Sequence, residues 1–253
     1  MVRENAWTGC DKKKINKVME FCEGYRQFIS SCKTERECAA RSIELAKEHG
    51  YKDLNEIIKK GGTLKAGDKV YACNMGKALV LFNVGREPLE NGMKILGAHI
   101  DSPRLDVKQN PLYQDEELVL LDTHYYGGIK KYQWTAIPLA LHGVVVLTDG
   151  KKINVVIGED MDDPVVGVSD LLIHLAAEQM EKNGAKVVEG EEACLWAAER
   201  RKTKMPVKRR KRARHTFLSF FRRNTALKKK ILCQQSWRQF RPDLRVIWVL
   251  TTV

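Results

Sequence analysis

The fold of this chain is decided by one stretch, Gly97-Ala98-His99-Ile100-Asp101-Ser102-Pro103. An apolar run from Met93 to Leu96 precedes it, which is typical of a buried strand, so we expect a strand over residues 93–100. A histidine and an aspartate two residues apart suit a metal site, because the imidazole binds the ion and the carboxylate orients the ring. A strand-end histidine with an ordinary hydrogen bond is the alternative, and the setting favours the metal ligand.

Several long motifs follow in order and carry a resemblance to a known family. They are Arg104-Leu105-Asp106, the segment Thr123-His124-Tyr125-Tyr126-Gly127-Gly128-Ile129-Lys130-Lys131-Tyr132-Gln133-Trp134, then Ile137-Pro138-Leu139-Ala140-Leu141-His142-Gly143 and Gly158-Glu159-Asp160. Over about residues 10–192 the chain resembles the bacterial branch of the aspartyl aminopeptidase family.

The resemblance implies an α/β fold in two parts. Residues 1–105 would be the N-terminal part of a metallopeptidase catalytic domain that holds two zinc ions. Residues 106–192 would be an inserted β-rich dimerisation domain, and the C-terminal half of the catalytic domain would be missing. The implied activity is a zinc metallo-aminopeptidase that removes N-terminal residues from peptides and works as a homo-oligomer.

The resemblance also implies roles for three residues. His99 would be a zinc ligand, and Asp101 would orient it in the catalytic site. His174 would bind substrate across the dimer, although a histidine on an amphipathic helix is more often packed or on the surface.

The composition changes abruptly near Glu192. Residues 1–192 hold 26 Lys and Arg against 30 Asp and Glu, a net charge of −4, whereas residues 193–253 hold 18 against 2, a net charge of +16. A run such as residues 208–214 permits phosphate binding, so a basic-tailed protein that binds nucleic acid or another anion is the alternative function.

A frameshift explains the basic tail better than nucleic-acid binding. When its codons are read one base earlier, residues 228–233 permit Glu-Glu-Glu-Asp-Phe-Leu and residues 244–249 permit Ala-Arg-Asp-Leu-Gly-Phe. These hidden peptides resemble the family's own continuation, and the change of frame would lie near residues 191–193. We therefore expect residues 193–253 to be out of frame and disordered.

Loss of the family continuation would remove most of the zinc site. A two-zinc site needs about five or six ligands and a general base, and the family carries most of them after the inserted domain. We expect this chain to be inactive and to bind zinc weakly. A third possibility is a structural remnant that dimerises through residues 106–190.

The remaining sequence signals concern the compartment. The seven cysteines are odd in number and form no CxxC pair, which indicates free thiols in a reducing environment. The N-terminus lacks the apolar segment of a signal peptide, and no run approaches the length of a membrane span. We expect a cytoplasmic protein without a membrane partner.

Local patterns predict most of the secondary structure. We expect helices over residues 11–32, from a capping box at Thr34 to His49, over 53–59 and from Ser169 to about Asn183. Strands are expected over residues 69–73, 78–84, 105–108, 118–121, 134–141, 143–147 and 153–157, with a hairpin turn at 74–77. The aromatic and basic loop over residues 125–134 is predicted to be packed or at an interface rather than a nucleic-acid surface.

Overall fold

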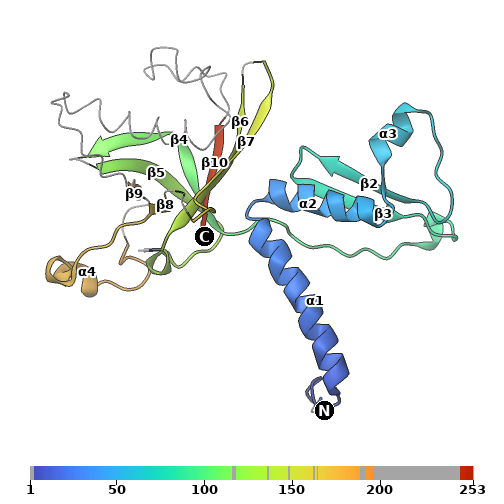
Figure 1. Cartoon of the computed structure of the whole chain (residues 1–253), viewed down its shortest axis with the longest axis horizontal. Helices are drawn as coiled ribbons and strands as arrows, with labels where there is room; N and C mark the ends of the chain where they lie inside the picture. Colours follow the sequence, from blue (N-terminus) through green and yellow to red (C-terminus); the bar gives the residue numbers. More distant parts are fainter. Residues whose placement is uncertain are drawn as a thin grey trace. The chain divides into compact units, whose positions relative to one another are not determined.

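The computed structural model describes residues 3–115, 118–135, 137–147, 149–161, 163, 165–188, 192–196 and 246–252. The chain divides into two compact units, Met1–Ser102 and Pro103–Val253. Figure 1 shows the first as helices with a small sheet and the second as a larger sheet. Among the described residues, no helix is long and apolar enough to cross a lipid bilayer.

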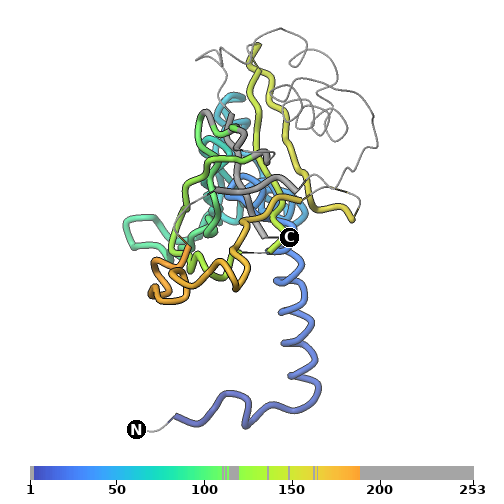
Figure 2. The backbone as a smooth tube through the Cα atoms, turned by 90° about the vertical axis from the view of Figure 1, so that its left-hand side faces the viewer, coloured from blue at the N-terminus to red at the C-terminus, as the bar shows by residue number. Residues whose placement is uncertain are grey.

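Two capped helices begin the first unit. Helix α1 (Lys12–Ser31) starts where the Asp11 side chain accepts a hydrogen bond from the Lys14 amide, and it buries none of its residues. Figure 2 shows α1 as a blue helix that leads away from the rest of its unit. Helix α2 (Glu35–Glu48) has the predicted capping box, in which Thr34 and Glu37 each bond the other's backbone amide.

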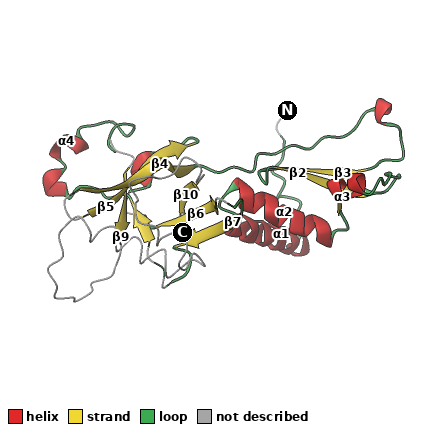
Figure 3. Cartoon of the chain, turned by 90° about the horizontal axis from the view of Figure 1, so that it is seen from above, coloured by secondary structure: helices red, strands yellow, loops and turns green. Residues whose placement is uncertain are grey.

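A three-stranded sheet packs against α2. It consists of β1 (Lys52–Asp53), β2 (Lys69–Asn74) and β3 (Ala78–Asn83), and the short helix α3 (Leu54–Lys59) follows β1. Figure 3 shows α2 beside β2 and β3. The buried side chains lie on both partners, and they are Cys38, Ala39 and Ala46 on α2 and Val70 and Tyr71 on β2.

The hairpin between β2 and β3 confirms the predicted turn. Met75 and Gly76 both have positive φ, 53° and 69°, and the Lys77 amide donates a hydrogen bond to the Asn74 carbonyl, which is typical of a type I′ turn. Arg36 of α2 donates to the Met75 carbonyl at 3.1 Å, and Lys77 pairs with Glu35. The hairpin is therefore attached to α2 by polar contacts as well as by packing.

The strand predicted over residues 93–100 is absent from the structure. Residues 92–103 form an extended loop, seen in Figure 1 between β3 and the second unit, and they pair with no strand in the described part of the chain. Leu96 is fully exposed and Ile95 is 83% exposed. The backbone N–H and C=O groups of a strand form hydrogen bonds to adjacent strands. An apolar sequence pattern therefore does not form a strand where no adjacent strand is available.

The second unit is one sheet that closes on itself. The strand order is β10-β4-β5-β9-β8-β6-β7, and β10 also pairs with β6, so the ring closes between β4 and β6. The strands are β4 (Arg104–Asp115), β5 (Leu118–Tyr126), β6 (Leu139–Val146), β7 (Lys152–Ile157), β8 (Val165–Gly167), β9 (Glu192–Trp196) and β10 (Val246–Thr252).

Strand β6 lies at the centre of this sheet. It pairs with β10 along one edge and with β7 and β8 along the other, so Leu139, Ala140, Leu141 and His142 are all buried. The strands predicted over 134–141 and 143–147 form one strand, because residues 142 and 143 continue the same ladder, but this strand begins at Leu139 and not at Trp134. The core also includes Leu105, Leu121, Val155, Ile157 and Val166.

Two strands come from the basic tail, which was expected to be disordered. Strand β9 joins β5 to β8, and β10 joins β4 to β6. The expectation of disorder is thus wrong for Ala193–Trp196 and Val246–Thr252. The basic run over residues 208–214 lies outside the described residues.

The helix predicted from Ser169 to Asn183 is wrong. The structure has a 3-10 turn, η3 (Ile173–Leu175), and one short helix, α4 (Ala177–Met180). Of the residues in these two elements and the residue between them, Ala176 alone is buried, and Leu175 is 70% exposed. An amphipathic helix draws most of its stability from burying its apolar stripe, and this stripe meets no core here.

Loss of the Thr34 cap should destabilise the first unit. The substitution Thr34→Ala removes the side-chain acceptor for the Glu37 amide, and we expect the free energy of unfolding to fall by about 1 kcal/mol. Urea unfolding followed by circular dichroism measures this change. Ser30→Ala, at an exposed position of α1, is the control and should shift it by no more than about 0.5 kcal/mol.

The two cysteines Cys38 and Cys22 should differ in reactivity. Burial, with a further contribution from Cys32, raises the pKa of the Cys38 thiol from 9.0 to about 11. The folded state thus favours the neutral thiol, and this contribution to stability is lost as the pH rises from 9 through 11. At pH 8 we expect iodoacetamide to modify exposed Cys22 well before Cys38, as measured by mass spectrometry of the native protein. Equal rates would contradict the structure.

Candidate functional site

His99 and Asp101 lie together, as the sequence predicted. The Nδ1 atom of His99 is 3.0 Å from the Asp101 carbonyl oxygen and 3.3 Å from the carboxylate atom Oδ1. The imidazole is 84% exposed and the Asp101 side chain 42% exposed. With its proton on Nδ1, the ring donates to Asp101, which directs Nε2 outward as the nitrogen that can bind a metal ion.

The pair is suited to supply one ligand of a zinc site and the residue that orients this ligand. Zinc in proteins takes three or four protein ligands, usually His, Cys, Asp or Glu. Within the described ranges, no group of three or more such side chains is placed to hold an ion. His99 is therefore suited to be one ligand, with Asp101 to orient it, and the described residues do not assemble the rest of a zinc site.

His174, the predicted substrate-binding residue, lies in the second unit. It is the middle residue of η3 and is exposed. The helix predicted around His174 is absent, and the residue lies instead in a single 3-10 turn. His99 and Asp101 belong to the first unit, whereas His174 belongs to the second.

A buried arginine, Arg104, follows the His-x-Asp motif at the start of β4 and contacts two side chains that are more exposed. Arg104 is 6% exposed, its Nε donates to the Asp106 carboxylate at 2.8 Å, and its guanidinium lies 3.8 Å from the centre of the Tyr126 ring. Charge pairing and ring stacking both suit arginine better than lysine. These contacts join the start of β4 to the end of β5.

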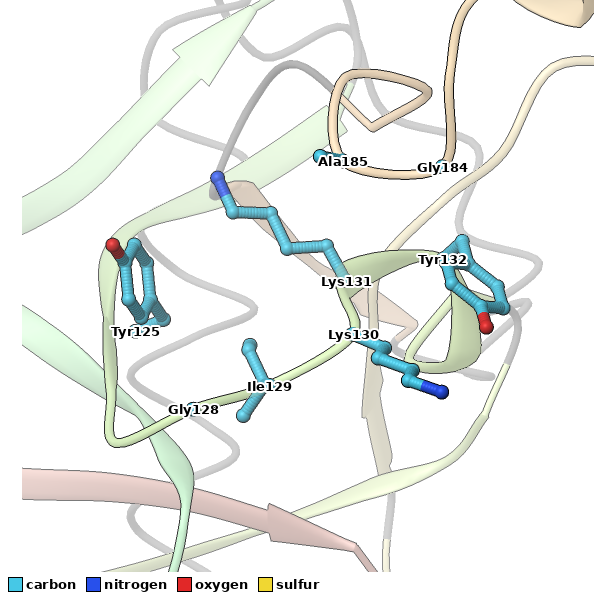
Figure 4. Close-up of a pocket in the computed structure, with 8 residues that line it drawn as sticks. All are labelled: Tyr125, Gly128, Ile129, Lys130, Lys131, Tyr132, Gly184 and Ala185. Carbon is cyan, nitrogen blue, oxygen red and sulfur yellow. The ribbon is translucent and has the colours of Figure 1, made fainter.

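The loop that follows β5 lines a pocket. The cavity has a volume of about 610 Å³ and is lined by Tyr125, Gly128, Ile129, Lys130, Lys131, Tyr132, Gly184 and Ala185. Figure 4 shows Lys130 and Lys131 leaving the backbone in opposite directions, and the ammonium of Lys131 lies 5.2 Å from the Tyr125 ring centre. The aromatic and basic loop is thus folded against residues 184 and 185.

His142 is buried and paired with a carboxylate. It is 3% exposed on β6, and its Nε2 is 2.8 Å from the Glu159 carboxylate. The pocket was not predicted, because its two walls are about 55 residues apart in the sequence and no local motif links them.

Comparison with known proteins gives a consistent result. The family model described as aminopeptidase I zinc metalloprotease (M18) matches residues 28–235. A probable M18 family aminopeptidase 1 of Clostridium acetobutylicum is 58% identical over 189 residues, which are 75% of this chain and 41% of that protein. A crystal structure of aminopeptidase I from Clostridium acetobutylicum superposes with a TM-score of 0.78 at 45% identity, covering 100% of this chain and 53% of that one.

A more distant solved structure shares the fold. It is the S. cerevisiae mApe1 dodecamer, with a TM-score of 0.61 and 16% identity, and the match covers 94% of this chain and 49% of that chain. This chain thus spans about half of the solved structures that it matches and about two fifths of the curated relative.

Two neighbouring glycines offer a matched test of the loop that leads into the pocket. Gly127 has φ of +74°, and a Cβ there would lie 3.4 Å from Pro103 Cα, whereas a Cβ on Gly128 meets nothing within 4 Å. We expect Gly127→Ala to lower the free energy of unfolding by about 1–2 kcal/mol. Gly128→Ala should change it by no more than about 0.5 kcal/mol. Calorimetric unfolding compares the two, and equal effects would contradict the described loop.

Proposed function

The chain belongs to the aminopeptidase I zinc metalloprotease (M18) family, and we propose that it is part of a zinc-dependent aminopeptidase that removes N-terminal residues from peptides. The observation that carries this proposal is the His99–Asp101 pair, in which a carboxylate residue orients an exposed imidazole. The identity of 58% to a probable family aminopeptidase supports the same activity.

Each site residue has a proposed role. His99 would hold a zinc ion through Nε2, and Asp101 would fix the orientation and tautomer of the ring. A bound zinc ion supplies Lewis-acid activation of water and of the scissile carbonyl. His174 would contact the substrate, and the exposure of its short turn is compatible with that role. Two zinc ions and a homo-oligomeric, cytoplasmic enzyme complete the proposal.

We further propose that this chain alone is inactive and that its tail is out of frame. The proposed inactivity is supported by the described residues, which add no further metal ligands to His99 and Asp101. The proposed frameshift is supported by the change in net charge after residue 192 and by the family-like peptides in the shifted frame. The nucleotide sequence of codons 185–200, read in all frames, tests the frameshift. One uninterrupted frame that encodes the tail in the source genome would refute it.

A chimera tests the activity. We join residues 1–192 to the part of the Clostridium acetobutylicum aminopeptidase that lies beyond its match to this chain. We expect the chimera to cleave aminoacyl-para-nitroanilides in a zinc-dependent manner and to leave N-acetylated substrates intact. The 253-residue chain should show no cleavage under the same conditions.

Variants of the chimera test the roles of individual residues. His99→Ala should abolish the zinc-dependent rate because it removes a ligand, and Asp101→Asn should lower metal affinity or activity about 10- to 100-fold. His49→Ala changes an exposed histidine at the end of α2 and serves as the control, with activity unchanged. Full activity in His99→Ala would refute the proposed site.

A further inference from the structure

Two cysteines lie together at the joint between helices α1 and α2 (Figure 1). Cys32 is the C-cap residue of α1, and Cys38 lies near the start of α2. The two residues are 5% and 7% exposed. The Cys38 thiol donates a hydrogen bond to the Cys32 carbonyl oxygen, with a distance of 3.7 Å between Sγ and oxygen. The link between the helices thus brings two thiols that are six residues apart into one buried position.

The electrostatics of Cys38 place the Cys32 side chain against its thiol. Burial raises the pKa of the Cys38 thiol to about 11, and Cys32 contributes to this shift through its charge and through a hydrogen bond to the Cys38 side chain. The carboxylates of Glu37 and Glu35 act in the same direction. The site therefore disfavours a thiolate, whereas a disulfide carries no charge and suits a buried position.

The backbone at Cys32 permits the small movement that an S–S bond requires. A disulfide needs Cα atoms about 4.4–6.8 Å apart and side chains that point toward each other. Cys38 is held within α2, but Cys32 has φ of −123° and ψ of 85° and begins the link over residues 32–34. Because the Cys38 sulfur already contacts the Cys32 backbone, a change in this link and in the Cys32 side chain is enough to join the two sulfurs.

We propose that Cys32 and Cys38 are a redox-active pair that closes to a disulfide when the protein meets a hydroperoxide. One thiol attacks the peroxide, whose O–O bond breaks, and it becomes a sulfenic acid while water or an alcohol leaves. The second thiol then attacks that sulfur, so that the S–S bond forms, the S–O bond breaks and water leaves with the proton of the attacking thiol.

The contact between the thiols makes the second step effectively intramolecular, which offsets the low thiolate fraction of Cys38. In total the pair loses two protons and two electrons, and the hydroperoxide is reduced. A thiol reductant such as dithiothreitol reverses the change by exchange through a mixed disulfide.

The disulfide would fix the end of α1 to α2. Helix α1 buries none of its residues, so its attachment to α2 depends largely on the link over residues 32–34. A bond from Cys32 to Cys38 closes a loop that spans this link and the start of α2, and it reduces the conformational freedom of the unfolded chain. We therefore expect oxidation to stabilise the joint between the two helices.

Peptide mapping of the whole 253-residue chain tests the proposal. Trypsin cuts after Arg26, Lys33, Arg36 and Arg41, so the two cysteines fall in separate peptides, residues 27–33 and 37–41. The native protein is treated with hydrogen peroxide, and the remaining thiols are then alkylated before digestion. We expect mass spectrometry to find these two peptides joined, and dithiothreitol to separate them.

Two variants control the mapping. Cys22→Ser removes an exposed thiol of α1 and should leave the joined peptides unchanged. Cys38→Ala removes the second thiol, so the joined peptides should be lost and dimedone should trap a sulfenic acid on Cys32. The oxidised parent chain gives a readout that does not depend on any variant. Its unfolding temperature should rise by about 5–10 °C, and amide exchange at residues 27–38 should slow.

The outcomes separate this pair from the enzymatic proposal, because neither His99 nor Asp101 takes part in it. An inactive chimera with joined peptides refutes the activity and supports the redox-active pair. Unjoined peptides after Cys22 is fully oxidised overturn the pair and leave its thiols as ordinary core packing. Disulfides from Cys32 or Cys38 to another cysteine or to a second chain, formed in preference to each other, also overturn it.

Discussion

Backbone pairing between strands is the constraint that determines the structure of this chain. In the second unit, six of the seven strands have neighbours on both sides, and β7 is paired with β6 alone. In the first unit, residues 93–100 have an apolar sequence suited to a strand but no described neighbour. The segment that carries His99, the proposed zinc ligand, thus has no described strand neighbour on either side.

Side chains at the junctions reinforce the paired regions. Buried Arg104 is held by the Asp106 carboxylate within β4, and its guanidinium stacks on the Tyr126 ring, which connects the first residue of β4 to the last residue of β5. His142 of β6 is held in a similar way by Glu159, which lies just after β7. Buried polar groups of this kind are costly without partners, and with partners they restrict each strand to one register.

Local signals predicted the elements whose stability is local. The capping box of Thr34 and Glu37 and the hairpin turn at residues 74–77 depend on neighbouring residues, and both were predicted correctly. The strand over 93–100 and the helix after Ser169 depend on distant partners, and neither formed. The His99–Asp101 contact was predictable from its two-residue spacing, whereas the pocket walls at residues 125–132 and 184–185 meet only through the fold.

Strand β10 has a consequence for how the second unit is made. It comes from the last residues of the chain, and it closes the sheet by lying between β4 and β6, more than 100 residues earlier. Such distant contacts raise the contact order and slow folding, because a long loop must be ordered before the contact forms. During synthesis, the edges of β4 and β6 that β10 covers stay open until residues 246–252 have left the ribosome, and that interval favours chaperone binding or aggregation.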